Sequence, residues 1–457
     1  MKKVFCTIVL MLLIATTSYA QATFSMTGSY WAEGKYWFNY NDAPGTDATY
    51  SERSFGFYEQ DINLYPKITM ENTSLNFRIA ITDVYWGAPD ADGSEGINQT
   101  APDTNANDDN IQIERAYLSH NFGKVTLDVG LMNGTQWATT FADDNQAQWR
   151  VKAVARTPVG IVGAVLEKNR EWGAEDNDLE GEDRDSYGLF AITKAGPVFV
   201  KPLLWYVRVG GPFQGSALEP FDGSGTKFTI FNPVLGFDGD LGVVSFESEI
   251  NYKMYSLESS SLDVDEDWST LGLYLNVWKA LDAMTPGLVL AYGSFDDTLG
   301  DAVFSAAAGG NTFGAGALRA LSSTAAFDFE DDFYSTIILG DEYGWGGGDD
   351  LAGMTLIKLY VNDIATGIDP LTLNFYAAYI MSNQEATDAA LLPDPLTIPN
   401  NYEDATAWEA SLGADYKITD NLKYSIYGAY ADISYDVTGI DDPESVYILA
   451  NAITFTF

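Results

Sequence analysis

The sequence predicts a single all-β domain, a transmembrane antiparallel β-barrel of 16 to 18 strands. Three observations predict it: apolar and polar residues alternate over segments of about 10 to 14 residues, short and long connections alternate between them, and aromatics reach 14% although the net charge is −41. Period-two alternation is typical of strands whose two faces meet different surroundings. The 457 residues would allow about three ordinary domains, but a large barrel counts as one.

Residues 1–20 have the pattern of a secretory signal peptide. Two lysines precede an apolar run from Ile8 to Ala15, and Ser18-Tyr19-Ala20 fits the small-x-small cleavage pattern. The run is shorter than the roughly 20 residues that a transmembrane helix needs. The only cysteine, Cys6, lies in this segment. The mature chain, 21–457, is therefore expected to be one barrel without disulfides or thiolate metal sites.

The alternation is clearest from Val244 to Met254. Its even positions are apolar except for Ser248, while its odd positions carry Ser, Glu, Glu, Asn and Lys. The segments 371–379 and 270–277 repeat the pattern. Strands of a soluble sandwich are usually about 5 or 6 residues long. These longer segments therefore favour strands that cross a membrane.

Short turns and long polar loops alternate along the chain. The turns are expected at Glu71 to Ser74, Asn121 to Lys124, Thr157 to Gly160, Lys194 to Pro197, Phe237 to Gly242, Leu281 to Gly287, Asn362 to Pro370 and Ile418 to Leu422. With the loops between them, the best count is 18 strands; 16 stays open if one pair in 210–239 or 295–351 is not a hairpin. Short periplasmic turns and long extracellular loops are typical of outer-membrane barrels. A lumen this wide is an aqueous channel or holds an inserted segment.

The last segment places the chain in the outer membrane of a Gram-negative bacterium. Its aromatic and aliphatic residues share one face and the chain stops on Phe457, an ending that resembles the assembly signal of outer-membrane proteins. Membrane lipid and lipopolysaccharide would then surround it. The 65 acidic residues against 24 basic ones argue against nucleic acid as a partner, because phosphate would be repelled.

Basic residues recur on one face of 148–156, directly after the loop 133–148. If Trp149 and its alternate neighbours face lipid, then Arg150, Lys152 and Arg156 face inward. Opposed rows of charge let wide pores select among ions, so a constriction with a transverse field is one interpretation; charges that only line the rims are the other. Further inward candidates are Arg78, Arg115, Arg208, Glu247 and Glu249.

Several segments resemble the general porins of Gram-negative bacteria, and more closely the homotrimeric porin type of sulfate-reducing and related bacteria. They are Ile113 to Ser119, Val125 to Leu131, the loop that runs to Asp144, Tyr187 to Ala191, Val198 to Tyr206 and the ending at Phe457. The resemblance implies a homotrimer and a third loop folded inward. In that loop Asp143 and Asp144 would face a wall that carries Arg115, Arg150, Lys152 and Arg156.

Two loop features leave alternatives open. The longest loop, 296–351, contains a Gly- and Ala-rich stretch from Asp301 to Phe327, which could fold into the lumen as a short helix, form a subunit contact or stay outside. Acidic clusters such as Glu175 to Asp185 suit hard cations, yet none is a complete calcium loop. Solvated loops are the default, and no metal or cofactor is expected.

The sequence therefore predicts a passive channel for small hydrophilic solutes and ions, with a cation preference set by its acidic mouths. The alternatives are a solute-specific porin with an inserted loop, an outer-membrane hydrolase, or a structural surface protein with a closed lumen. A hydrolase usually needs a histidine base near its nucleophile. The sequence contains a single histidine, His120, which lies beside a predicted turn. No enzymatic activity is therefore expected.

Overall fold

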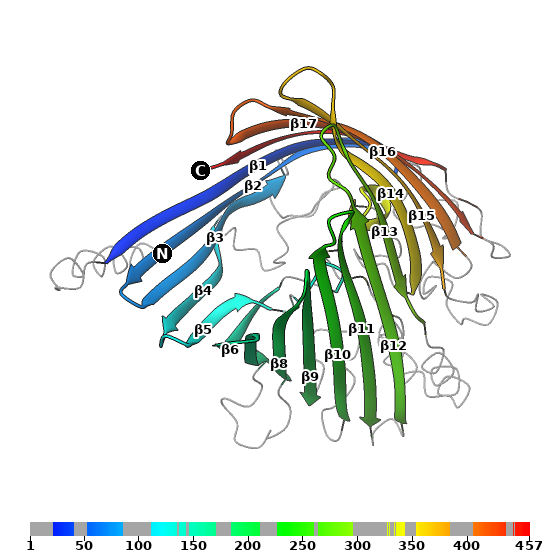
Figure 1. Cartoon of the computed structure of the whole chain (residues 1–457). Helices are drawn as coiled ribbons and strands as arrows, with labels where there is room; N and C mark the ends of the chain where they lie inside the picture. The colour runs from blue at the N-terminus through cyan, green and yellow to red at the C-terminus, as the bar shows by residue number, and fades with distance from the viewer. Residues whose placement is uncertain are drawn as a thin grey trace, which may run out of the picture.

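The computed structural model of the chain describes most of the predicted barrel. The described residues are 22–40, 53–85, 111–134, 137–142, 146–170, 184–210, 226–259, 264–295, 327, 329, 333, 335–342, 353–383, 405–435, 442 and 444–457. They form one antiparallel barrel (Figure 1). Its strands are β1 (Thr23–Tyr40), β2 (Arg53–Met70), β3 (Thr73–Tyr85), β4 (Ile111–Asn121), β5 (Val125–Asn133), β6 (Ala147–Thr157), β7 (Gly160–Arg170), β8 (Arg184–Ala195), β9 (Val198–Gly210), β10 (Thr226–Asp240), β11 (Ser245–Ser259), β12 (Val264–Trp278), β13 (Thr285–Gly293), β14 (Met354–Ala365), β15 (Leu371–Ser382), β16 (Ala405–Lys417), β17 (Leu422–Tyr435) and β18 (Val446–Thr456).

The sheet closes on itself. Each strand pairs with its neighbours in sequence, and β1 pairs with β18 from Ser29 opposite Thr456 to Phe38 opposite Tyr447. Closure leaves no sheet edge, which a barrel in lipid requires because unpaired backbone groups are costly there. The predicted fold class and the best strand count of 18 are therefore confirmed.

The eight predicted turns are all present. The strands on either side of them leave only residues 71–72, 122–124, 158–159, 196–197, 241–244, 279–284, 366–370 and 418–421 as connections. The start of β1 and the end of β18 lie at this end of the barrel, since Thr23 pairs with Thr69, Phe457 and Gly28 exchange backbone hydrogen bonds of 2.9 and 3.0 Å, and Thr456 N bonds to Asn421 O. The count of 16 is excluded because every candidate hairpin forms.

The two faces of the sheet differ as the alternation predicts. The outer face of β6 to β9 exposes large apolar side chains, among them Trp149 and Leu189, each 61% exposed. The inner face buries polar groups instead, including Glu167, Glu249 and Glu409. An apolar outer band with a polar interior is the pattern of a barrel that stands in lipid.

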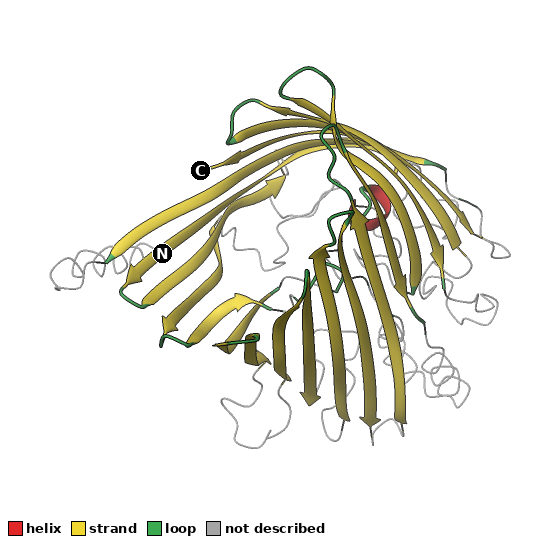
Figure 2. Cartoon of the chain, viewed as in Figure 1, coloured by secondary structure: helices red, strands yellow, loops and turns green. Residues whose placement is uncertain are grey.

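Part of the lumen is filled by a hydrophobic cluster. Its wall residues come from β1 and β12 to β18, and they pack against Phe141 and against residues of the connection between β13 and β14. In that connection η3 (Ile338–Glu342) is a short π-helix, drawn red inside the ring of strands in Figure 2. Among the described residues no helix is long and apolar enough to cross a membrane.

Candidate pore constriction

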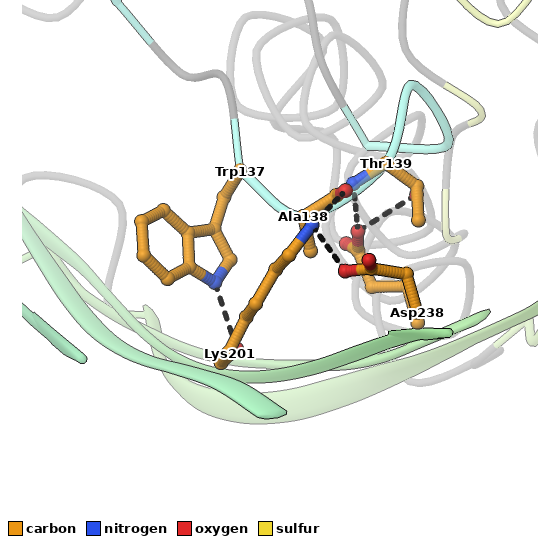
Figure 3. A network of polar contacts seen from close by, with 6 residues as sticks. Trp137, Ala138, Thr139, Lys201 and Asp238 are labelled. Carbon is orange, nitrogen blue, oxygen red and sulfur yellow. Dashed lines mark hydrogen bonds and ion pairs between the residues drawn. The ribbon is translucent and has the colours of Figure 1, made fainter. Parts of the chain in front are cut away.

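The loop after β5 enters the lumen. Its described residues 137–142, here called the first insert, contact the inner faces of β9 to β11 (Figure 3). The indole Nε1 of Trp137 donates to the backbone oxygen of Lys201 in β9 at 3.0 Å, and Lys201 Nζ returns a hydrogen bond to the oxygen of Ala138 at 3.3 Å. Lys201 also pairs with Asp238 of β10 at 2.6 Å. The insert is thus fastened to β9 and β10.

A buried carboxylate holds the middle of the first insert. Glu249 of β11, 1% exposed, accepts hydrogen bonds from the backbone nitrogen and hydroxyl of Thr139 at 3.2 and 2.8 Å. Gly236 lets the insert approach β10, because a Cβ there would lie 2.2 Å from the Cβ of Ala138. Charged acceptors make stronger hydrogen bonds than neutral ones, so Glu249 sets the position of this loop.

A second insert lies in the connection between β13 and β14. It consists of the described residues Phe327, Phe329, Phe333 and 335–342. Glu409 of β16 is fully buried, and its carboxylate accepts hydrogen bonds from the backbone nitrogens of Ile337, Ile338 and Leu339 at 2.9 to 3.2 Å. A carboxylate is stabilised by such a row of backbone N–H groups at the start of a helical turn.

Two further wall residues complete the anchor of the second insert. Tyr376 of β15 donates its hydroxyl hydrogen to Glu409 and accepts a hydrogen bond from the backbone nitrogen of Ile337 at 2.8 Å. Lys358 of β14 donates to the backbone oxygen of Ser335 and lies 4.4 Å from the ring centre of Tyr376. This insert is therefore held by hydrogen bonds to Glu409, Tyr376 and Lys358 and by apolar packing in the hydrophobic cluster.

The two inserts meet at Phe141. This side chain has no exposed surface, and its ring stacks on Tyr274 and Phe327 with centroids 5.5 and 5.1 Å apart. Phe329 and Phe333 contact the same ring at 5.2 and 5.4 Å. Since the two segments share one aromatic core, they act as a single obstruction beside β12 to β18.

The basic residues predicted on β6 face the lumen, and two of the three are paired with acids. Arg150 forms an ion pair with Glu167 of β7, and both side chains are at most 9% exposed. Lys152 lies 3.3 Å from Asp128 of β5. Arg156 is exposed near the turn end of the strand, about 20 Å along β6 from Arg150 at the usual rise per residue. The basic residues therefore extend along β6 from the loop end to the turn end. Arg150 and Lys152 are neutralised by acids on the adjacent strands β7 and β5.

The other inward candidates lie on two walls. Arg78 of β3 contacts Glu114 at 2.5 Å and donates to Asn63 at 2.9 Å, while Arg115 is its register partner on β4. Glu247 faces inward on β11, where it accepts from Tyr274 and Asn276, both at 3.0 Å. Arg78 and Glu247 are thus each part of a hydrogen-bonded group on the inner wall.

The prediction for Arg208 is wrong. On β9 it shares a face with Leu204 and Tyr206, which are exposed on the outside, and its register partners are Asp185 and Thr229. The alternation puts Val207, 7% exposed, on the inside instead. Asp185 pairs at 3.2 Å with Lys168, which lies opposite the outward Trp149. Arg208 therefore belongs to the outer rim and does not line the pore.

Some predicted features lie outside the described residues. These are Asp143 and Asp144, the signal peptide, most of the Gly- and Ala-rich stretch and most of the acidic loop clusters. Within the described part of the chain, no group of three His, Cys, Asp or Glu side chains is arranged to hold a metal ion. His120 sits on the outer face of β4, where its Nδ1 lies 2.7 Å from the hydroxyl of Thr73.

Of the residues that hold the inserts, the sequence predicts only Glu249 as an inward residue. The others are Phe141, Lys201, Asp238, Lys358, Tyr376 and Glu409. One available signal was the pair of alternating alanine runs, Ala405 with Ala407 and Ala429 with Ala431, which face inward and are buried under the second insert. Small inward side chains leave room for a segment packed against the wall.

Three cavities lie along the inner wall from β12 through β18 to β1, between the inserts and the turn end of the barrel. One of about 290 Å³ is bounded by Thr140, Ser335 and Lys358, and a second of about 300 Å³ by Ile337, Tyr376 and Asp415. Asn362 and Tyr376 border both of them. A third of about 690 Å³ shares Asp415, Lys423 and Thr454 with the second and reaches the turns 366–370 and 418–421. Shared lining residues thus connect the inserts with the turn end.

Solved structures of similar shape exist. OccK9 (OpdG) of Pseudomonas aeruginosa matches with a TM-score of 0.52 and 11% identity, covering 95% of this chain and 99% of that one. OccAB4 of Acinetobacter baumannii gives 0.51 and 11%, with 96% and 100% covered. The outer membrane protein OpdK of P. aeruginosa gives 0.50 and 10%, with 95% and 98% covered. The likeness shows the fold. No protein-family model and no curated protein matches the chain.

Proposed function

We propose that this protein is an outer-membrane channel of a Gram-negative bacterium, through which small hydrophilic solutes diffuse. The observation that carries the proposal is the pair of inserts docked inside a closed 18-stranded barrel. A barrel of this size without them would enclose a wide aqueous channel. Inserts fixed by buried carboxylates narrow such a channel to a defined cross-section, which a structural protein would not need.

The outer-membrane location rests on the surface of the barrel. Its outer face is apolar, its first and last strands pair with each other, and its buried polar groups point inward. In lipid only such a closed barrel or a helix satisfies the backbone. OpdK, which has this fold, is an outer membrane protein, and this supports the same surroundings of lipid and lipopolysaccharide here.

The inserts favour a solute-selective channel over an unrestricted one. They occupy the lumen beside β12 to β18, so solutes pass next to inner walls that are crowded with hydrogen-bonding groups. Arg150 and Lys152 on the wall opposite β12 to β18 are paired with acids, and selection among ions then falls mainly to the acidic loops. We therefore expect a modest cation preference, because like charges at a mouth concentrate counterions. The expected homotrimer is a separate proposal, which the mass of the detergent-solubilised protein tests.

Single-channel recording in a planar bilayer tests the function. Folded wild-type protein should conduct, and replacing residues 137–142 by a Gly-Ser segment of equal length should raise its conductance. Folding is checked for both proteins by the shift in gel migration between unheated and heated samples. If folded wild-type protein never conducts, the channel function is wrong and a closed-lumen structural role takes its place.

A further inference from the structure

The cavity of about 300 Å³ beneath the second insert has the size of a small-ligand site. It lies between Ile337 of the insert and the inner faces of β1 and β15 to β18. Its lining includes the aromatic residues Trp31, Tyr376 and Tyr427 together with amides, hydroxyls and carboxylates. A solute that enters from the inserts and leaves at the turn end meets this cavity, because the neighbouring cavities share its residues on both sides.

The two tyrosines are held in place by their hydroxyl groups. Tyr376 donates to Glu409, and Tyr427 donates to Glu33 of β1 across the barrel seam. Trp31 lies on the same inward face of β1 as Glu33 and Lys35, whose ammonium is 5.9 Å from the indole centre. Fixed rings present flat apolar surfaces at a small entropic cost, which suits a ring-shaped solute with C–H faces.

The carboxylates of the cavity already have donors. Asp415 accepts hydrogen bonds from Asn374 at 2.8 Å and from Ser425 at 2.5 Å, and Lys423 lies 3.6 Å away. Glu33 lies 3.3 Å from Lys35 and accepts from Tyr427. An ion that entered would give up water without finding an unengaged counter-charge, and that desolvation is costly. A neutral solute does not meet this penalty.

The amides and hydroxyls keep capacity for further hydrogen bonds. Ser425 donates to Asp415 but retains its two acceptor lone pairs. Asn374 uses one N–H toward Asp415 and one lone pair toward the backbone nitrogen of Asp363, which leaves one of each. Donors and acceptors close together match a hydroxyl group, because a hydroxyl both donates and accepts.

We propose that this cavity is a binding subsite for neutral, hydroxyl-rich solutes of about one sugar ring. The inference deepens the proposed function and rests on it, since it names the class of solute that the channel carries. Three basic residues of β6 and β9 agree with it, because Arg150, Lys152 and Lys201 are each paired with an acid. Arg156 is the exposed basic residue near the turn end of β6.

The test measures block of the single-channel current by solutes added at the turn side. Glucose is the neutral probe, succinate the anionic one and ethylammonium the cationic one, each tested from 1 to about 300 mM at constant ionic strength. Glucose should reduce the current or add noise in a saturable way, while succinate and ethylammonium should not. Saturable block by either ion with none by glucose would overturn the subsite.

Two matched pairs of variants locate the effect. Trp31→Ala removes an aromatic face of the cavity, and Trp149→Ala removes a tryptophan from the outer face. Asn374→Ala is compared with Asn76→Ala, which changes an inward amide on β3. The cavity variants should raise the half-blocking glucose concentration about threefold to tenfold, the usual worth of one such contact, and the controls should leave it unchanged.

The outcomes separate the two proposals. A folded protein that does not conduct would overturn both the channel function and the subsite. A conducting protein that glucose does not affect, or that glucose blocks equally in Trp31→Ala and wild type, would overturn the subsite and leave the channel function standing.

Discussion

Phe141 of the loop after β5 stacks on Phe327 of the connection between β13 and β14, with ring centroids 5.1 Å apart and planes 16° from parallel. The two residues are separated by eight strands in sequence, and neither exposes any side-chain surface. The contact makes the position of one insert depend on the other. The cross-section of the pore is therefore a joint property of both inserts.

Truncation of Phe141 should loosen both inserts at once. Phe141→Ala removes a fully buried ring, a change that costs about 3 to 5 kcal/mol of packing free energy in protein cores. Because the barrel wall is untouched, we expect the loss to appear as higher and noisier conductance, with larger neutral solutes admitted. Phe231→Ala on the outer face of β10 is the control. Unchanged conductance in Phe141→Ala would show that the aromatic core does not set the pore width.

Loss of the Glu409 carboxylate should release the second insert. Glu409→Ala removes the acceptor for the backbone nitrogens of Ile337, Ile338 and Leu339, and each buried donor left without a partner costs about 1 to 3 kcal/mol. Flickering between conductance levels is expected, and the insert should become open to proteolysis. Glu409→Gln keeps one acceptor oxygen and should fall between wild type and Glu409→Ala. The exposed Glu258→Gln, which should behave as wild type, controls for charge.

The pairing of Arg150 with Glu167 predicts opposite effects from two single variants. Arg150→Gln leaves an extra negative charge on the wall and should move the reversal potential toward cations, while Glu167→Gln should move it toward anions. The double variant should return close to wild type. Each single variant leaves one buried charge unpaired, which can cost about 3 to 5 kcal/mol, so folding is measured first. If the double variant kept the shift of Arg150→Gln, Arg150 would act as a free charge in a transverse field.

Closure of the barrel should depend on Gly28. A Cβ at this position would lie 2.4 Å from the ring of Phe457 and 2.8 Å from the backbone oxygen of Asn63. The ring could move but the β2 backbone could not, so Gly28→Val should destabilise the seam by about 1 to 3 kcal/mol, as overpacking does. The measurement is the fraction of heat-modifiable barrel after folding into detergent or lipid. Gly367→Ala, in the turn between β14 and β15, is the comparison. It has open space but a φ of +78°, so it separates crowding from backbone strain.

The barrel could be predicted because its signals are local. The alternation from Val244 to Met254 appears unchanged as the two faces of β11, and each short turn expected from the sequence joins two paired strands. The prediction failed at Arg208 although the alternation of β9 is regular, because Leu204 and Tyr206, at the same parity, face outward. In that case residue type was given more weight than the strand period.

Local patterns predict the closed barrel, its short turns and the face on which most side chains lie, because strand period and turn length depend on neighbouring residues. The choice of 18 strands over 16 and the partners of the inward charges required the folded barrel. Arg150 meets Glu167 and Lys152 meets Asp128 through strand register, and Glu409 meets the backbone of residues 337–339 about 70 positions away. Whether a charge creates a field or is neutralised depends on partners brought together by closure, and no local pattern encodes that distance.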